Sequence, residues 1–407
     1  MRPLEEARAD VLGAVDRLPG ERVGLERAGG RVLAEDATAG HDVPPFPNSA
    51  MDGFAVLASD VAAPPVTLTV LEDVPAGSVA TQPVKPGTAI KIMTGAPMPE
   101  GADTVVKVEV TRQPDDGRVE ILESMGEGTA VRPAGGDITR GSTVLEAGTL
   151  LGPVELALLA TVGVARPLVA RRPVVAVMST GDELAPPETA ELVPGQIRDS
   201  NRPLMRALVA EAGGDVTDMG IVPDREESLV DVLDEAASTA DVIVTSGGVS
   251  MGEYDLIKRV LLARGTVDFW QVAMQPAKPF AFGHVGGKPL FGLPGNPVSV
   301  LVAFEQFARP ALLRMQGAGS LFRPRIRARM GEAVETDPAK VVFLRVAISG
   351  GEGEPVARRS GGQSSNVLSA VTAADGFAVV PVGVGKIHEG DPVDVELFRH
   401  PSSEMGR

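Results

Sequence analysis

A repeated order of apolar run, polar loop and helix pattern between residues 174 and 299 constrains the fold of this chain more than any other feature. Val174 to Met178 and Val242 to Val244 are short apolar runs that suit strands buried on both faces. A helix pattern follows each run: the first opens at Asn201, which can cap it, and the second ends near Gly265. Such alternation predicts a doubly wound, mostly parallel α/β sheet.

Three polar loops follow these strands, and the carboxyl ends of parallel strands meet at one sheet edge where ligands bind. The loops are Ser179 to Glu183, Ser246 to Asp255 and Pro294 to Ser299. Glycines in the second loop let backbone N–H groups approach a phosphate, and the third loop opens a helix whose N-terminus favours an anion. We expect one anion-binding crevice, although a plain turn is the alternative for each loop. The expected substrate contacts are Ser179, Thr180, Gly181, Asp182, Ser246, Gly247, Gly248, Ser250, Pro294, Gly295, Asn296 and Ser299.

Charged residues near this edge favour magnesium and phosphate chemistry. Glu183 and Asp255 suit Mg²⁺, which commonly bridges a protein carboxylate and a substrate phosphate; a helix cap is the alternative for each. Lys278 can supply a positive charge to an oxyanion, and the alternative is a solvated surface lysine. Asp224, with Glu227 three residues later, matches a capping box, so the residues alone favour a structural role for Asp224.

Composition excludes several other kinds of site and partner. The chain has no cysteine, which excludes disulfides, thiolate metal sites and a cysteine nucleophile, and its 4 histidines lie far apart. The formal net charge of −16 opposes binding to nucleic-acid phosphates. The N-terminus lacks the apolar stretch of a signal peptide, and the most apolar region, Leu150 to Ala170, contains charged residues and a proline. We therefore expect a cytoplasmic protein that binds neither nucleic acid nor membrane.

The remaining sequence predicts three further domains beside the α/β domain, which we place at residues 169–317. Valine-rich runs divided by proline and glycine indicate a β-rich inserted domain at 41–137. Residues 1–40 and 138–168 then form a mixed linker domain. Alternating patterns after about residue 320 indicate a small C-terminal β-barrel at 318–407, with a sandwich as the alternative.

Glycine- and proline-rich turns carry a second group of candidate residues outside the α/β domain. The tract Asn48 to Phe54 sets Asp52 between small residues, as an interface or active-site turn would. Similar turns elsewhere carry a hydroxyl at Thr94, a guanidinium at Arg132 and a carboxylate at Asp137. Purely structural turns are the alternative for this group.

These motifs resemble the molybdopterin molybdenumtransferases, the MoeA and gephyrin E-domain family, over nearly the whole chain. The resemblance implies a transferase of molybdenum cofactor biosynthesis. Such an enzyme inserts molybdate into adenylylated molybdopterin with Mg²⁺-dependent release of AMP and gives Mo-molybdopterin. The resemblance rests on six tracts in family order: Asn48 to Gly53, Thr94 to Pro97 with Gly101 to Asp103, Val131 to Asp137, Ser179 to Leu184, Ser246 to Asp255 and Pro294 to Ser299.

The resemblance also implies an elongated homodimer of four-domain subunits and a role for each candidate residue. The β-rich domain of one subunit would bring Asp52, Thr94, Arg132 and Asp137 to the α/β domain of its partner, and the linker domain would serve dimerisation. Mg²⁺ would be bound by Glu183 and Asp255. The molybdopterin adenylyltransferase and apo-molybdoenzymes are further partners that it suggests. The implied catalytic residues are Asp52, Thr94, Asp137, Glu183, Asp224 and Asp255, and the implied molybdate side is Lys278, Ser299, Arg345 and Ser365.

Some positions depart from the family pattern, and two other functions remain as alternatives. The departures are Phe54 for a tyrosine, Gly136 for an acidic residue, Glu253 for an aspartate, and Gln275 with Ala277 in a segment that usually reads Lys-Pro-Gly-Lys. One alternative is the molybdopterin adenylyltransferase, whose fold resembles the α/β domain alone. The other is a non-catalytic, gephyrin-like scaffold that binds partner peptides. Retention of the implied catalytic carboxylates favours the transferase.

Overall fold

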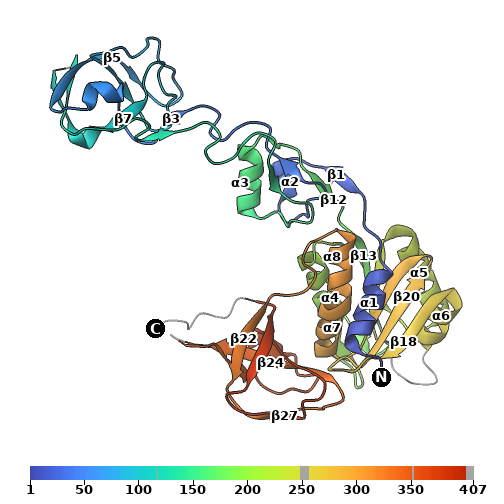
Figure 1. The fold of residues 1–407 in the computed structure, drawn as a ribbon. Coiled ribbons are helices and arrows are strands. Elements are labelled where there is room, and N and C mark those ends of the chain that lie inside the picture. Colours follow the sequence, from blue (N-terminus) through green and yellow to red (C-terminus); the bar gives the residue numbers. More distant parts are fainter. Residues whose placement is uncertain (116, 248–255, 351–352, 400–407) are drawn as a thin grey trace.

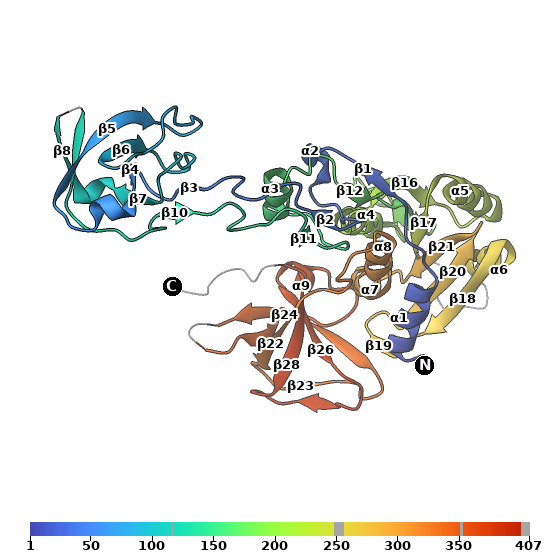
Figure 2. The same ribbon diagram turned by 45° about the horizontal axis from the view of Figure 1, so that its top comes forward.

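The computed structural model describes residues 1–115, 117–247, 256–350 and 353–399, which form a row of compact units (Figure 1). The α/β unit and the C-terminal β unit lie side by side at one end, as both views show (Figure 2). A small mixed unit containing α2 (Leu25–Ala28) and α3 (Pro153–Thr161) comes next, and a β-rich unit forms the other end. The expected multidomain α/β class is therefore confirmed.

A six-stranded sheet forms the core of the α/β unit. Its strands are β13 (Val174–Thr180), β16 (Asp215–Val222), β17 (Val242–Ser246), β18 (Gly265–Gln271), β20 (Pro279–Val285) and β21 (Lys288–Leu293). They lie in the order β16-β13-β17-β21-β20-β18. The first four strands are parallel, and β20 and β18 add an antiparallel edge. The predicted mostly parallel sheet is confirmed.

Helices cover both faces of this sheet, which is why its central strands are apolar throughout. Along β13, Val175 and Val177 pack into one apolar cluster, whereas Ala176 and Met178 pack into the cluster on the opposite face. The face of Val175 and Val177 carries α4 (Asn201–Glu211) and α7 (Pro297–Ala303), and the opposite face carries α5 (Glu226–Thr239) and α6 (Leu256–Arg264). No helix in the described ranges is long and apolar enough to cross a membrane.

Helix α7 is the first part of a longer helical segment. It continues through a π-helical turn, η3 (Phe304–Ala308), into α8 (Arg309–Met315). The N-terminal helix α1 (Leu4–Gly13) packs with it, because Leu4 and Val11 belong to the same apolar cluster as the sheet. The boundary at residue 40 stays a prediction, but the helix at the start of the chain lies in the α/β unit.

The start of α4 differs from the expectation. Asp199 Oδ1 accepts the backbone N–H groups of Asn201 and Arg202, at 3.1 Å each. Asp199 therefore satisfies the helix start, and the prediction that Asn201 caps it is wrong. The carboxylate of an aspartate just before a helix can reach these free N–H groups, whereas Asn201 is already the first helical residue.

The start of α5 also lies one residue away from its predicted place. The helix begins at Glu226, and Arg225 occupies the N-cap position without a side-chain cap bond. The predicted capping box of Asp224 and Glu227 is therefore wrong, because Asp224 precedes the cap position. The acidic residues of the first turn still favour this helix end through the helix dipole.

Five strands close into a barrel in the C-terminal unit. They are β22 (Arg325–Met330), β24 (Val341–Ser349), β25 (Val356–Arg359), β26 (Gly376–Val380) and β28 (Pro392–Leu397). Their order is β24-β25-β22-β28-β26, and β26 pairs back onto β24. The predicted β-barrel is confirmed. A short strand of the α/β unit, β19 (Met274–Gln275), pairs with the start of β24 and joins the two units.

The β-rich unit holds a second six-stranded sheet. Its strands are β4 (Gly53–Val56), β5 (Val66–Val74), β6 (Thr88–Ile92), β7 (Thr104–Lys107), β8 (Thr111–Asp115) and β9 (Arg118–Ile121). They lie in the order β7-β4-β6-β5-β9-β8, with an apolar cluster on each side. Phe54 is fully buried in one of these clusters, where a tyrosine hydroxyl would need a hydrogen-bond partner.

The mixed unit is built from segments on both sides of the β-rich unit in the chain. In it β1 (Gly20–Arg22) pairs with β12 (Leu168–Ala170), and β2 (Ala37–Thr38) pairs with β11 (Thr143–Leu145). Residues from both segments share one small apolar cluster. This arrangement is the one expected of a linker domain with an inserted domain, while the four residue boundaries stay predictions.

Candidate functional site

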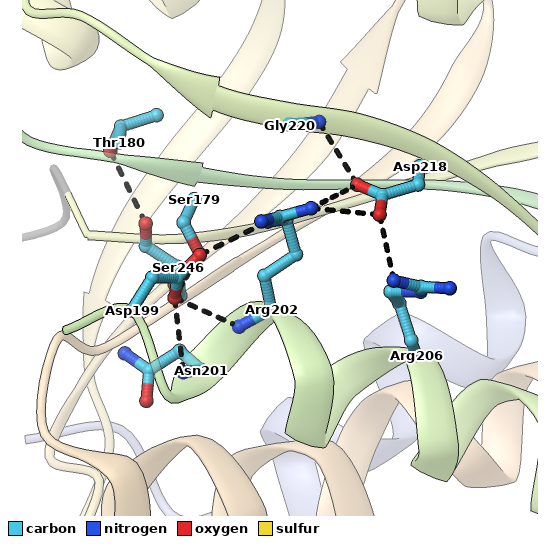
Figure 3. A network of polar contacts seen from close by, with 9 residues as sticks. All are labelled: Ser179, Thr180, Asp199, Asn201, Arg202, Arg206, Asp218, Gly220 and Ser246. Atoms are coloured by element: carbon cyan, nitrogen blue, oxygen red, sulfur yellow. Dashed lines mark hydrogen bonds and ion pairs between the residues drawn. The ribbon is translucent and has the colours of Figure 1, made fainter. Parts of the chain in front are cut away.

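Buried hydroxyl groups lie at the carboxyl ends of β13 and β17 (Figure 3). Ser179 and Ser246 are opposite each other in the sheet, and their Oγ atoms are 3.2 Å apart. Thr180 Oγ1 donates to the carbonyl oxygen of Ser246 at 3.2 Å. All three side chains are buried. The structure therefore brings together the first residues of two loops that the sequence placed at one crevice.

Asp199 holds these hydroxyl groups in place and was missed from the sequence (Figure 3). Its side chain is 1% exposed. It accepts hydrogen bonds from Ser179 Oγ at 3.0 Å and from Arg202 Nε at 3.1 Å, besides the N–H groups at the start of α4. A buried carboxylate is stable only when its charge is paired and hydrogen-bonded, and Asp199 has both. Its place just before a helix is the signal that could have found it.

Arg202 extends the network from Asp199 to the neighbouring strand β16. Its Nη1 contacts both carboxylate oxygens of Asp218, at 2.8 and 2.9 Å, and Arg206 contacts the same carboxylate at 2.9 Å. Burial raises the pKa of Asp218, but its hydrogen bonds to Arg202 and Gly220 and the two arginine charges lower the pKa overall. Helix α4 is thereby fixed to the sheet beside the expected crevice.

Two positions at this edge favour glycine, for different reasons. Gly247 has a φ of +92°, and a Cβ atom there would lie 2.6 Å from the backbone carbonyl oxygen of Thr180. Gly181 has a φ of +145°, a conformation that residues with a side chain rarely adopt. The loop after β17 can therefore pass over the end of β13 only with glycine at 247. The further predicted residues Gly248, Ser250 and Asp255, like the departure at Glu253, lie outside the described residues.

Exposed carboxylates stand on the loops after β13 and β16. Asp182 Oδ1 accepts the backbone N–H of Asp224 at 3.1 Å, so these two loops lie together. Asp182 and Glu183 are both exposed. No three His, Asp or Glu side chains of the described ranges are arranged to hold a metal ion, and Asp255 is outside those ranges. Mg²⁺ usually takes one or two carboxylates, several waters and substrate phosphate oxygens, so this donor set fits it.

The third predicted loop meets the barrel. Asn296 Nδ2 donates to Ser365 Oγ at 2.8 Å, and the N–H of Val298 donates to the carbonyl oxygen of Ser365 at 3.1 Å. Asn201 Nδ2, at the start of α4, donates to the carbonyl oxygen of Gly295 at 2.7 Å. The start of α7 therefore has fewer free N–H groups for an anion than the sequence predicted. Of the other predicted contacts on this segment, Pro294 and Ser299 are buried.

Arg345 is fully buried and holds the loop before Ser365. Its Nη2 donates to the carbonyl oxygens of Gly362 at 2.7 Å and Ser364 at 3.3 Å. Its backbone N–H donates to Gln363 Oε1 at 2.9 Å. Burial lowers the pKa of Arg345. The predicted direct contact with molybdate stays a prediction, and the bonds of this guanidinium to backbone carbonyls give it a structural task that sequence reasoning missed.

Lys278 lies at the junction between the α/β unit and the barrel. It is exposed, and its carbonyl oxygen accepts the N–H of Val272 at 2.8 Å. A hydrogen bond from Lys340 lowers the pKa of Asp337 in the barrel unit, and the charge of Lys278 contributes to the same shift. The structure therefore places a predicted cation near the barrel, beside the strand β19 that joins the two units.

The residues predicted in the β-rich part do not meet this edge within one chain. Asp52 and Thr94 belong to the β-rich unit, Arg132 lies on β10 (Val131–Arg132), and Asp137 follows β10 in the chain. The β-rich unit and β10 lie far from the α/β unit in both views (Figures 1 and 2). Asp52 Oδ1 accepts the N–H of Thr94 at 2.7 Å and its hydroxyl at 2.8 Å. These two bonds, the backbone one first, lower the pKa of Asp52.

Family models of known proteins match three successive parts of the chain. The model described as MoeA N-terminal region (domain I and II) matches residues 2–163. The model described as probable molybdopterin binding domain matches residues 176–314, and the model described as MoeA C-terminal region (domain IV) matches residues 327–398. Together these three ranges cover most of the chain.

Individual proteins match over the same extent. Molybdopterin molybdenumtransferase of Haemophilus influenzae is 37% identical over 98% of this chain and 99% of its own length. Molybdopterin molybdenumtransferase 2 of Mycobacterium tuberculosis is 38% identical over 97% of this chain and 99% of its own length. A crystal structure of the molybdopterin biosynthesis MoeA protein from Pyrococcus horikoshii has a TM-score of 0.85 and 28% identity, covering 98% of this chain and 100% of that one.

Proposed function

The chain belongs to the molybdopterin molybdenumtransferase family, and from that premise we propose its reaction. The protein is a transferase of molybdenum cofactor biosynthesis that inserts molybdate into adenylylated molybdopterin. Mg²⁺-dependent release of AMP accompanies the insertion, and the product is Mo-molybdopterin. The observation that carries the proposal is the hydrogen bond between Asn296 and Ser365, which joins the sheet edge to the barrel loop held by Arg345.

The sheet edge suits the phosphate groups of an adenylylated pterin. The backbone at Gly247 carries no side chain that would hold a phosphate away. Asp182 and Glu183 stand exposed on the neighbouring loop, and Glu183 would hold Mg²⁺ together with Asp255. That ion would screen the phosphate charge and favour the departure of AMP. The buried network around Asp199 keeps the strand ends in position while these groups bind.

The junction of the α/β unit and the barrel suits a second anion, molybdate. Lys278 supplies an exposed positive charge, and Ser365 places a hydroxyl at the start of α7, close to Ser299. Arg345 supports this side by fixing the carbonyl groups before Ser365. Two anions that repel each other must meet here, so the protein acts mainly by positioning and screening them. The dithiolene sulfurs belong to the substrate, and a chain with no cysteine can therefore perform the reaction.

A homodimer would complete this site. The β-rich unit, which carries Asp52 and Thr94, and β10, which carries Arg132, lie far from the α/β unit of their own chain (Figures 1 and 2). We propose that these residues and Asp137 reach the sheet edge of a partner subunit. The carboxylate of Asp52 would arrive ionised, because Thr94 lowers its pKa. We also propose that the protein works in the cytoplasm, between the molybdopterin adenylyltransferase that supplies its substrate and the apo-molybdoenzymes that take its product.

Release of AMP tests this proposal directly. Purified protein is given adenylylated pterin and Mg²⁺, with and without molybdate, and transfer of the cofactor to an apo-enzyme is assayed in parallel. We expect AMP release that depends on molybdate and yields active cofactor. Tight binding of the adenylate without turnover would favour a gephyrin-like scaffold. Formation of adenylate from ATP and pterin would favour an adenylyltransferase.

A further inference from the structure

A buried polar network joins the α/β unit to the barrel at a second place, away from the candidate site. Its centre is Gln306 in η3, whose side chain is buried. Gln306 Oε1 accepts a hydrogen bond from Arg8 of α1, and its Nε2 donates to Glu396 Oε2 of β28 at 2.9 Å. Arg325 of β22 donates to the other oxygen of Glu396 at 2.6 Å. One side chain thus connects the N-terminal helix, η3 and two barrel strands.

The charges on its two sides allow only one orientation of the Gln306 amide. A guanidinium only donates hydrogen bonds, and an ionised carboxylate only accepts them. The amide oxygen must therefore face Arg8 and the amide nitrogen must face Glu396. An amide turned the other way, or a residue with only one of these two functions, would remove a hydrogen bond from a buried charged group.

The neighbouring residue in η3 anchors the segment that leads to the barrel. Glu305 is 3% exposed and accepts two hydrogen bonds from Arg323, at 2.8 Å each. Arg323 lies between α8 and β22 and also contacts Glu211 of α4 at 2.7 Å. The π-helical turn therefore carries two adjacent buried polar residues, one for the connecting segment and one for the barrel. Such turns are often found at functional sites.

Gln306 and the candidate site lie on the same helical segment. The segment from α7 through η3 to α8 begins at Pro297, next to Asn296, which donates to Ser365 of the barrel. Further along, Gln306 contacts Glu396 of the same barrel. Besides the bond at Ser365 and the pairing of β19 with β24, Gln306 is a further contact between the two units. Each additional contact at a separate place removes some freedom of the barrel to rotate on the α/β unit. The contact at Gln306 therefore helps determine how the barrel sits at Asn296.

We propose that Gln306 is a positioning residue for the molybdate side of the site. By pairing Arg8 with Glu396 it fixes the orientation of the barrel, so that Ser365 stays at the start of α7. This inference rests on the proposed function, because its consequence for molybdate follows only if that anion binds at the junction. Loss of the contact moves the barrel and weakens the use of molybdate. The sheet edge, where the adenylylated pterin binds, stays intact.

Substitutions at Gln306 and Glu396 can break and restore the contact. Gln306→Glu keeps the acceptor for Arg8 but sets a carboxylate against Glu396. Adding Glu396→Gln to this variant restores one donor and one acceptor between the two side chains. Gln306→Leu removes both hydrogen bonds without adding charge and serves if the first variant folds poorly. The matched control is Asp394→Asn, which breaks the exposed ion pair with Arg327 on the same two barrel strands.

The orientation of the barrel can be measured without any assay of activity. The chain has no cysteine, so spin labels attach only at the introduced, exposed positions Ser238→Cys on α5 and Val382→Cys in the barrel unit. We expect the distance distribution between the labels to broaden in Gln306→Glu and in Gln306→Leu. It should return to the original width in the double variant and stay unchanged in Asp394→Asn.

The second measurement is the dependence of AMP release on molybdate. We expect the apparent KM for molybdate to rise about tenfold in Gln306→Glu and to recover in the double variant. Binding of adenylylated pterin without molybdate should not change. Unchanged label distances in both single variants overturn the proposal, and so do broadened distances with an unchanged KM. If the unaltered protein released no AMP, the proposed function would fall, while the distances would still decide whether Gln306 holds the barrel.

Discussion

The sheet edge of the α/β unit and the turns of the β-rich unit hold their candidate residues in different physical settings. At the sheet edge, Ser179, Asp199 and Ser246 are buried and connected by hydrogen bonds. In the β-rich unit, Asp52 is exposed, and its carboxylate accepts hydrogen bonds from the nearby turn at Thr94. Groups ordered by folding are preorganised for a ligand, whereas exposed groups are ordered only when a second surface covers them. This difference is the one expected if, as we propose, one chain holds one half of the site and presents the other half to a partner.

The largest expected effect tests whether the two halves belong to different subunits. Glu183→Gln and Asp52→Asn should each reduce AMP release on the order of 100-fold or more. The reason is that each removes a charged protein group from the proposed site around the reacting substrate. When the two variants are co-expressed, each mixed dimer has one site with both original groups. Random pairing should then restore about one quarter of the original activity. Activity is measured as molybdate-dependent AMP release.

The control for this experiment is a single chain that carries both substitutions. It has no intact half to contribute and should stay inactive when it is expressed alone or with a second copy of itself. If the mixed dimers recovered no AMP release while both variants still dimerised, the two halves would not combine across subunits. The burial of one set of candidate residues and the exposure of the other would then need another explanation.

A second prediction compares a buried aspartate with an exposed one. Asp199→Ala leaves the buried side of Arg202 and the start of α4 without their acceptor, which should destabilise the α/β unit by about 3–5 kcal/mol. The urea midpoint of that unit, followed by the fluorescence of Trp270, should fall accordingly. Asp52→Ala removes an exposed carboxylate and should leave this midpoint unchanged. Equal shifts of the urea midpoint in the two variants would contradict the contrast between buried, hydrogen-bonded residues at the sheet edge and exposed residues in the β-rich unit.

Sequence patterns predicted the elements whose signals are local. The apolar run at Val174 to Met178 indicated a buried strand, as the structure has it. Glycine at 247 was predicted to let the backbone approach a phosphate, which stays a prediction, and its closeness to the carbonyl oxygen of Thr180 was not foreseen. Closure of the barrel depends on pairing between β24 and β26, which are far apart in the chain, so alternation alone left a sandwich open. Asp199 was missed because Ser179, whose hydroxyl donates to its carboxylate, lies on another element 20 residues earlier in the chain.

Contacts between units were even harder to predict from the sequence than contacts within a unit. Asn296 and Ser365 are 69 residues apart, and nothing in either segment indicates that they meet. The resemblance supplied Arg345 as a candidate, but not its burial or its bonds to the loop before Ser365. Residues 1–40 were predicted to belong to the linker domain, whereas α1 packs against the α/β unit, because Arg8 and the apolar residues of α1 find their contacts there.

A third, smaller effect concerns the ionisation of Asp52. Thr94 lowers the pKa of this carboxyl through its N–H and its hydroxyl, so the carboxylate persists to lower pH than in an unfolded chain. The stabilisation from these bonds is present above the pKa of the unfolded aspartate and is lost as the pH falls through the folded pKa. Thr94→Val removes only the hydroxyl and should raise the pKa part of the way. NMR titration of the Asp52 carboxyl carbon measures the change.

The control is Thr111→Val, which removes a hydroxyl of the same unit that bonds to the carbonyl oxygen of Val108. It should leave the titration of Asp52 unchanged. An unaltered titration in Thr94→Val would show that the hydroxyl of Thr94 does not lower the pKa of Asp52. The ionisation of Asp52 in the proposed site would then depend on the surface of the partner.

The smallest expected effect concerns Gln275, which stands where the family segment usually has a lysine. Gln275 is exposed on β19 and pairs in register with Val342 of β24, near the predicted cation Lys278. A second cation there should lower the apparent KM of molybdate, since an exposed charge within a Debye length contributes about 1 kcal/mol or less at low salt. Gln275→Lys should therefore lower this KM about twofold to fivefold at low salt. The gain should disappear at high salt.

The neutral control Gln275→Met separates charge from packing, because it has a similar length and no charge. An equal gain in Gln275→Met, or a gain that survives high salt, would assign the effect to packing at the junction. A charge effect, in contrast, should act on molybdate and leave the binding of adenylylated pterin at the sheet edge unchanged. An effect on molybdate alone would show that the sheet-edge half of the site contains two anion sites of different character. One is formed by backbone groups that Asp199 holds in place. The other is the exposed cationic junction, whose affinity for molybdate depends on the residue at position 275.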